Sequence, residues 1–198
     1  VAVVLSITAT VCLTGAFHED GLADTCDALG GPVSRARALE IMKDSRVGSY
    51  GVLGLVLTLA AKAATSLALC EHDLLKAATA IIIAHTVSRA MPVILLRSLA
   101  YAGDPAQAKA KPLARQVSTN CLAAALAIAG LVAAVGAAWS GSGLAALDAT
   151  LACLVVTGAC AVWFQRRLGG FTGDTLGAVQ QWSEVAFLLG WCAKFSIP

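Results

Sequence analysis

Long apolar stretches dominate this chain and restrict what it can fold into. They cover roughly residues 1–17, 49–69, 77–96, 117–138 and 149–164, with a less pure sixth stretch from about 175 to 195. A membrane-spanning helix needs ~20 mostly apolar residues, so these stretches qualify or nearly qualify. Alanine is abundant in them, and alternation with a period of two is absent, which argues against strands. We therefore expect an all-α, polytopic transmembrane bundle of about six helices, forming one integral-membrane domain over residues 1–198.

The composition excludes an ordinary soluble domain. Hydrophobic residues make up 58% of the chain and charged residues 13%, against about 45–50% and about 25% in soluble domains. The first apolar stretch lacks the basic start of a signal peptide. It also begins with Val1 instead of methionine. We therefore expect a further N-terminal part in the whole protein.

Lysine and arginine predict the orientation of the bundle. The connections 30–48, 70–76, 97–116, 139–148 and 165–174 carry four, one, four, none and two of these residues. This alternation matches the rule that basic residues gather in cytoplasmic loops. Segments 18–48, 97–116 and 165–174 are therefore predicted to face the cytoplasm.

The stretch HEDGLADTCDALGG, residues 18–31, gathers four acids in a weakly charged chain: Glu19, Asp20, Asp24 and Asp27. On a helix, Asp20, Asp24 and Asp27 fall within about 60° of one another, whereas Glu19 points elsewhere. Crowded carboxylates near a membrane are costly, and a bound divalent cation removes their repulsion. Magnesium prefers one or two carboxylates with phosphates and water. The pattern predicts a magnesium site, with a solvated polar helix end as the alternative.

A second motif, RRLGGFTGDTLGA, covers residues 166–178. Its arginines, Arg166 and Arg167, suit bidentate phosphate recognition. Its glycines allow a ligand to approach the backbone closely; they are Gly169, Gly170 and Gly173. Asp174 is interpreted either as a metal ligand or as the N-cap of the last helix.

A third motif, EIMKDSRVGSYG, covers residues 40–51. Lys43 and Arg46 lie near each other at the entrance to an apolar stretch, where they favour phosphate binding. The alternative is ordinary basic flanking of a membrane span. Gly48 and Gly51 suggest a loop that approaches another group closely.

Ionisable residues also occur inside the apolar stretches. His85 and Arg89 share one helix face because they are four residues apart, and Lys62 lies in the preceding stretch. Such residues are functional candidates by default, although Arg89 could instead extend toward the cytoplasmic surface.

Together, these residues provide acids for a metal and bases for phosphate on the cytoplasmic side of a helical bundle. This inventory suits phosphoryl transfer to or from a phosphate-linked substrate. The seven cysteines form no CxxC pair and indicate no zinc or iron–sulfur site.

The three motifs, in this order, resemble the cobalamin synthase family, the adenosylcobinamide-GDP ribazoletransferases. The resemblance runs from about Phe17 to Glu184. Two departures are visible. The family commonly ends its first motif in DGxGG, where this chain has Asp27-Ala28-Leu29-Gly30, and the N-terminal stretch of family members is missing.

The resemblance implies a magnesium-dependent reaction at a bacterial inner membrane, in a multi-pass protein with its active site on the cytoplasmic side. Adenosylcobinamide-GDP is joined to α-ribazole or its 5′-phosphate, and GMP leaves. The implied metal ligands are Glu19, Asp20, Asp24, Asp27 and Asp174. The implied catalytic residues are Asp174, Asp27, Arg166 and Arg167. The implied substrate-binding residues are Lys43, Arg46, His85, Arg89, Gly169, Gly170 and Gly173.

Two alternatives stay open at this point. The acid motif is similar to the DGxxAR…GxxxDxxxD pattern of CDP-alcohol phosphotransferases, but here DGLAD, with Asp24, lacks the arginine and the later part is absent. A transporter could use Lys62, His85 and Arg89 as an ion or proton path, but the acids are expected at one surface rather than at the midplane. The expected partners are the two substrates and the lipid bilayer, with no nucleic acid; a homo-oligomer is left open.

Overall fold

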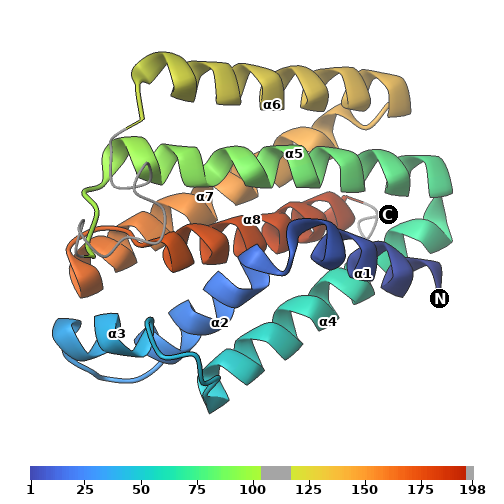
Figure 1. The fold of residues 1–198 in the computed structure, drawn as a ribbon. Helices are drawn as coiled ribbons and strands as arrows, with labels where there is room; N and C mark the ends of the chain where they lie inside the picture. The colour runs from blue at the N-terminus through green and yellow to red at the C-terminus, as the bar shows by residue number, and fades with distance from the viewer. Residues whose placement is uncertain (104–116, 195–198) are drawn as a thin grey trace.

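The computed structural model describes residues 1–103 and 117–194. These residues form eight α-helices (Figure 1): α1 Ala2–Thr14, α2 Phe17–Leu29, α3 Arg35–Ile41, α4 Ser49–His72, α5 Leu74–Ser98, α6 Thr119–Ser140, α7 Gly143–Leu168 and α8 Gly173–Ala193. The predicted all-α bundle is confirmed.

Four of these helices, α4 to α7, are long and apolar enough to cross a membrane. A fifth span results if α1 and α2 are counted together as one bent pair. The sixth predicted span is present as α8, but α8 is not among the helices that qualify by hydropathy. It packs against α2, α4, α5 and α7 and buries Gln180, Gln181, Ser183 and Glu184. The helix is therefore a core element whose polar side chains face protein instead of lipid.

The predicted first span, residues 1–17, is wrong as a straight helix. Helix α1 ends at Thr14, and Gly15 and Ala16 both adopt left-handed backbone angles, with φ of 61° and 58°. The chain then turns by 89° into α2. Thirteen residues of helix extend only ~20 Å, which is less than the ~30 Å hydrocarbon core of a bilayer. The break allows α2 to begin within the bundle, as Figure 1 shows.

The connections alternate between the two ends of the bundle (Figure 1). Residues 30–34, 99–103 and 169–172, which follow α2, α5 and α7, lie at one end, and the turns at Asp73 and at Gly141–Ser142 lie at the other. At the first end, Phe171 pairs with the backbone of Ala100 and Ala102 through hydrogen bonds of 2.9 and 2.8 Å. The described connecting residues of the three segments predicted to be cytoplasmic therefore share one end of the molecule, whereas residues 18–29 form α2, which runs into the bundle. The basic residues Lys109, Lys111 and Arg115 lie outside the described residues.

Candidate active site

The three sequence motifs meet around α2. This helix carries the acid motif and packs against α8 and α4, which begin in the other two motifs. The contact with α8 is close. A Cβ on Gly21 would lie 2.8 Å from the backbone oxygen of Asp174, and one on Gly177 would lie 3.1 Å from the backbone oxygen of His18. Because neither glycine has a side chain, the two backbones can approach each other directly.

Three of the predicted metal-binding acids lie near this crossing. Asp20 and Asp24 flank Gly21 in sequence, and Asp174 lies opposite Gly21 in the first turn of α8. Asp20 is exposed, whereas Asp24 and Asp174 are half-buried. Within residues 1–103 and 117–194, no three His, Cys, Asp or Glu side chains are close enough to hold a metal ion. The predicted metal site is therefore not a preformed cage of carboxylates.

Asp27 has a role that the sequence analysis missed. Its two carboxylate oxygens accept hydrogen bonds from the backbone N–H groups of Gly48, at 2.6 Å, and Gly51, at 2.7 Å. Gly48 is the N-cap of α4 and offers no side chain to the free N–H groups there. Asp27 caps α4 from the neighbouring helix and places a negative charge at its positive end.

The alternative that Asp174 is the N-cap of α8 is wrong. Thr172 is the N-cap, and it exchanges hydrogen bonds with Thr175 in a capping box. Gly173 and Asp174 follow in the first turn. Asp174 is therefore not needed to cap the helix, because Thr172 already does so.

The glycines before this turn have structural functions. Gly169 ends α7 in a left-handed conformation, with φ of 74°. Gly170, with φ of 156°, lies so close to the backbone oxygen of Ala100 that a Cβ would clash with it. Their predicted contact with substrate stays a prediction.

The predicted phosphate-binding arginines differ in their surroundings. Arg167 donates to the backbone oxygen of Gly31, at 2.8 Å, and to that of Leu29, at 3.5 Å, which fastens α7 to the end of α2. Arg166 is exposed at the same end. Arg35, outside the motifs, donates to the backbone oxygens of Leu168, at 2.5 Å, and Ala102, at 3.1 Å.

Arg46 forms an ion pair with Asp44 next to α4. Its guanidinium lies 2.6 Å from Asp44 Oδ2 and also donates from Nε to both carboxylate oxygens. These hydrogen bonds lower the pKa of Asp44 to about 2. Lys43 beside them is exposed. Any phosphate bound by Arg46 would compete with Asp44 for the guanidinium.

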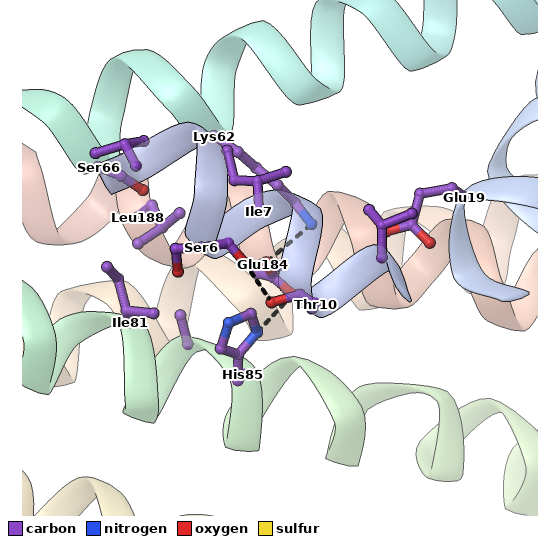
Figure 2. Close-up of a pocket in the computed structure, with 13 residues that line it drawn as sticks. Ser6, Ile7, Thr10, Glu19, Lys62, Ser66, Ile81, His85, Glu184 and Leu188 are labelled. Atoms are coloured by element: carbon purple, nitrogen blue, oxygen red, sulfur yellow. Dashed lines mark hydrogen bonds and ion pairs between the residues drawn. The ribbon is translucent and has the colours of Figure 1, made fainter. Parts of the chain in front are cut away.

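The intramembrane bases surround a residue that the sequence analysis missed, Glu184 on α8 (Figure 2). Lys62 Nζ lies 2.8 Å from Glu184 Oε1, and His85 Nδ1 lies 3.2 Å from Glu184 Oε2. Arg89 lies 3.8 Å from the same Oε2 and donates to the backbone oxygen of His85. The predicted substrate-binding pair His85 and Arg89, itself half-buried, is thus part of an ion cluster around the buried Glu184.

Glu19 belongs to this interior region and not to the acids near the α2–α8 crossing. It is 8% exposed and accepts a hydrogen bond of 2.9 Å from Gln181, while its other oxygen, Oε2, is buried with no hydrogen-bond partner in the described residues. With Lys62, His85 and Glu184, it lines a small cavity beneath α1 (Figure 2). The acids therefore reach from the end of the bundle into its interior. The sequence does contain a sign of this buried polar interior. Four polar residues occur within an apolar stretch: Gln180, Gln181, Ser183 and Glu184.

Comparison with known proteins identifies the family of the chain. The family model described as cobalamin-5-phosphate synthase matches residues 1–192. An adenosylcobinamide-GDP ribazoletransferase of Leptothrix cholodnii is 59% identical over 98% of this chain and 73% of its own length. Proteins of the same name from Albidiferax ferrireducens and Shewanella piezotolerans are each 44% identical over 96% of this chain and over 72% and 71% of their own lengths. No solved structure matches. The chain therefore belongs to the cobalamin-5-phosphate synthase family.

Proposed function

We propose that this chain carries out the reaction for which its relatives are named, adenosylcobinamide-GDP ribazole transfer, at the final stage of cobalamin biosynthesis. The observation that carries the proposal is the meeting of all three motifs around α2, in a chain that matches the family model over residues 1–192. The substrates are adenosylcobinamide-GDP and α-ribazole or its 5′-phosphate.

The reaction is a substitution at phosphorus. A ribose hydroxyl of the ribazole, one that stays free in the 5′-phosphate, forms a bond to the phosphorus on the cobinamide side, the bond from that phosphorus to the bridging oxygen breaks, and GMP leaves. The attacking hydroxyl gives up its proton to a base. Negative charge on the two phosphates must be neutralised while this happens, which is the main task of a phosphoryl-transfer site.

The acids around the α2–α8 crossing fit a magnesium ion. Asp20, Asp24 and Asp174 supply carboxylate oxygens, which are the ligands that Mg²⁺ prefers. The ion usually takes only one or two of them and completes its shell with phosphate and water. A site completed by the substrate's diphosphate needs no preformed cage. Bound there, magnesium would neutralise phosphate charge. Asp27 acts beside this site by holding the start of α4.

The basic groups at the same end divide into two sets. Lys43, Arg46 and Arg166 are exposed and can reach phosphate oxygens. Arg167 joins α7 to the end of α2 and keeps that end in place. Asp174, half-buried in the first turn of α8, is the candidate base for the attacking hydroxyl.

The proposed location of the site is the cytoplasmic side of a bacterial inner membrane. Within the described residues of the connections, the motif end of the bundle carries more lysine and arginine than the other end, where only Lys76 is found, and the positive-inside rule assigns such a basic end to the cytoplasm.

The test is an assay of the purified protein in lipid vesicles with magnesium, adenosylcobinamide-GDP and α-ribazole. We expect GMP and a corrinoid with a complete nucleotide loop. Removal of magnesium with a chelator should abolish product, and added magnesium should restore it. Absence of product under conditions in which the Leptothrix cholodnii relative is active would overturn the proposal.

A further inference from the structure

We propose that Glu184 and Glu19 are positioning residues for the transfer reaction: a buried chain of side chains runs from one to the other and sets the placement of the acid helix α2. The inference rests on the proposed function. It gives a role to the intramembrane ion cluster and separates Glu19 from the metal-binding acids.

The cluster lies deep in the bundle. Glu184 is eleven residues after the start of α8 at Gly173, and Lys62 is thirteen residues after the start of α4 at Ser49. At 1.5 Å per residue these positions are ~16–20 Å from the motif end. Charged groups at such depth are costly unless they are paired.

The charges in this region are balanced. Two acidic side chains, Glu184 and Glu19, lie with two basic side chains, Lys62 and Arg89, and Glu184 contacts both basic groups. Both Glu184 and Lys62 are 4% exposed. Removing one member of such a buried pair leaves the other uncompensated, which is strongly destabilising.

Hydrogen bonds connect Glu184 to Glu19 through two glutamines. Gln180 Nε2 donates to Glu184, at 2.7 Å, and to Ser88, at 3.1 Å. Gln181 Nε2 donates to Gln180 Oε1, at 3.0 Å, and to Glu19 Oε1, at 2.9 Å. Each amide has two N–H bonds, and both are used. The contact between Gln181 and Glu19 therefore fastens α2 to α8 in one orientation.

The hydrogen bond between Gln181 and Glu19 holds the N-terminal end of α2, which is the end joined to α1. Helix α1 contributes no buried residue, and it joins α2 through two left-handed residues, Gly15 and Ala16. The opposite end of α2 is held by the hydrogen bonds of Asp27. Asp20 and Asp24 lie between these two attachments. Losing the contact of Glu19 would allow the α2 segment that carries both acids to shift.

A pair of substitutions at Glu19 separates positioning from metal binding. Glu19→Gln removes the charge but retains an oxygen that can accept from Gln181. Its new amide would face the cavity, whose volume of about 30 Å³ has room for one water molecule. Glu19→Leu removes the hydrogen bond. A positioning role predicts that Glu19→Gln keeps at least about a third of the wild-type kcat, whereas Glu19→Leu and Gln181→Leu each lose ~30-fold or more, equivalent to ~2 kcal/mol.

The magnesium concentration that gives half-maximal rate distinguishes misplaced acids from unfolding. Unfolding lowers the amount of active protein but does not change this concentration. We expect the folded fraction of Glu19→Leu to need more magnesium for half-maximal rate, because Asp20 and Asp24 are misplaced. Loss of activity in Glu19→Gln equal to that in Glu19→Leu would overturn the proposal in favour of metal binding by Glu19. Unchanged kcat and magnesium dependence in Glu19→Leu and Gln181→Leu would also overturn it.

The Glu184 end is tested by restoring charge balance. Glu184→Gln leaves the cations without their carboxylate, and we expect ~30-fold loss of kcat, whereas the double variant Lys62→Met/Glu184→Gln should regain ~5-fold or more of it. Asp148→Asn is the control, since Asp148 pairs with Lys194 at 2.9 Å between α7 and the end of α8 but is half-exposed; it should keep full activity. A double variant no better than Glu184→Gln would overturn the role of charge balance. An inactive wild-type protein would count against the proposed function instead.

Discussion

The backbone oxygen of Asp174 lies 2.8 Å from the point that a Cβ on Gly21 would occupy. The first turn of α8 therefore rests directly on the backbone of α2, and the acid motif meets the last motif through this contact. On α8, Gly177 likewise has no side chain and allows the backbone of His18 on α2 to approach closely. The geometry of the candidate active site thus depends on two glycines that carry no chemistry of their own.

The first prediction concerns this crossing. Gly21→Ala forces backbone atoms apart, and we expect a loss of about 1–3 kcal/mol in the free energy of unfolding and at least ~10-fold in kcat. Gly158→Ala in α7 is the matched control, because a Cβ there meets nothing within 4 Å; it should be neutral or slightly stabilising. Thermal unfolding in detergent and the GMP-release assay measure both effects. A fully active Gly21→Ala protein would contradict this view of the crossing.

The second prediction distinguishes Asp24 from Asp27. Asp24→Asn should abolish turnover, because it removes a carboxylate that magnesium prefers as a ligand. Asp27→Asn should cost about 0.5–2 kcal/mol of stability as well, since it weakens the cap of α4. Unfolding curves beside initial rates test the contrast. Near-normal turnover of Asp24→Asn would favour the solvated helix end over a metal site.

The third prediction concerns the arginines, each changed to lysine so that charge and topology are kept. Lysine lacks the planar fork of arginine. Arg167→Lys should therefore weaken the hydrogen bond to Gly31, and Arg35→Lys should weaken those to Leu168 and Ala102. Both variants should have a lower unfolding temperature.

Arg166→Lys should lower kcat/KM ~10-fold without loss of stability if Arg166 binds phosphate in a bidentate manner. Arg37, which pairs only with Glu40 at the surface in the described structure, is the control. If Arg166→Lys keeps full activity, phosphate binding must be assigned to other bases.

The fourth prediction uses the pair of Asp44 and Arg46. The lowered pKa of Asp44, about 2, keeps this carboxylate ionised and available to Arg46 throughout the range from pH 5 to 8. The contribution of the pair is lost only as the pH falls from the ordinary value of 3.8 through the folded value. If Arg46 binds substrate phosphate, Asp44→Asn frees the guanidinium and should lower KM for adenosylcobinamide-GDP by up to about fivefold, since a solvent-exposed ion pair is weak. An unchanged KM would exclude competition at this arginine.

The fifth prediction concerns orientation. Single cysteines at positions 30 and 143, in a protein whose native cysteines have been replaced, should be labelled from opposite sides of oriented vesicles. Position 30 should react from the cytoplasmic side, because it lies at the basic end of the bundle. Labelling of both positions from the same side would contradict the topology.

The helical class, the positions of α4 to α7 and the shared end of the three motifs could all be predicted from the sequence. These features follow from quantities that add up locally. Apolar length determines whether a helix can cross a bilayer, and the number of basic residues in each connection biases its side. The three motifs were also recognisable, because each is a continuous run of residues.

The partners of the polar residues were decided only by the tertiary structure. Glu19 meets Gln181 across 162 positions, and Lys62 meets Glu184 across the interior of the bundle. No local pattern contains such a pairing. The same applies to the break after Thr14 and to the core position of α8, where buried polar side chains are accepted because α2, α4 and α5 supply their partners. Hydropathy records the preference of a residue for lipid or water, but a buried charge or amide also depends on the group it meets, and that group is brought near only when the helices pack.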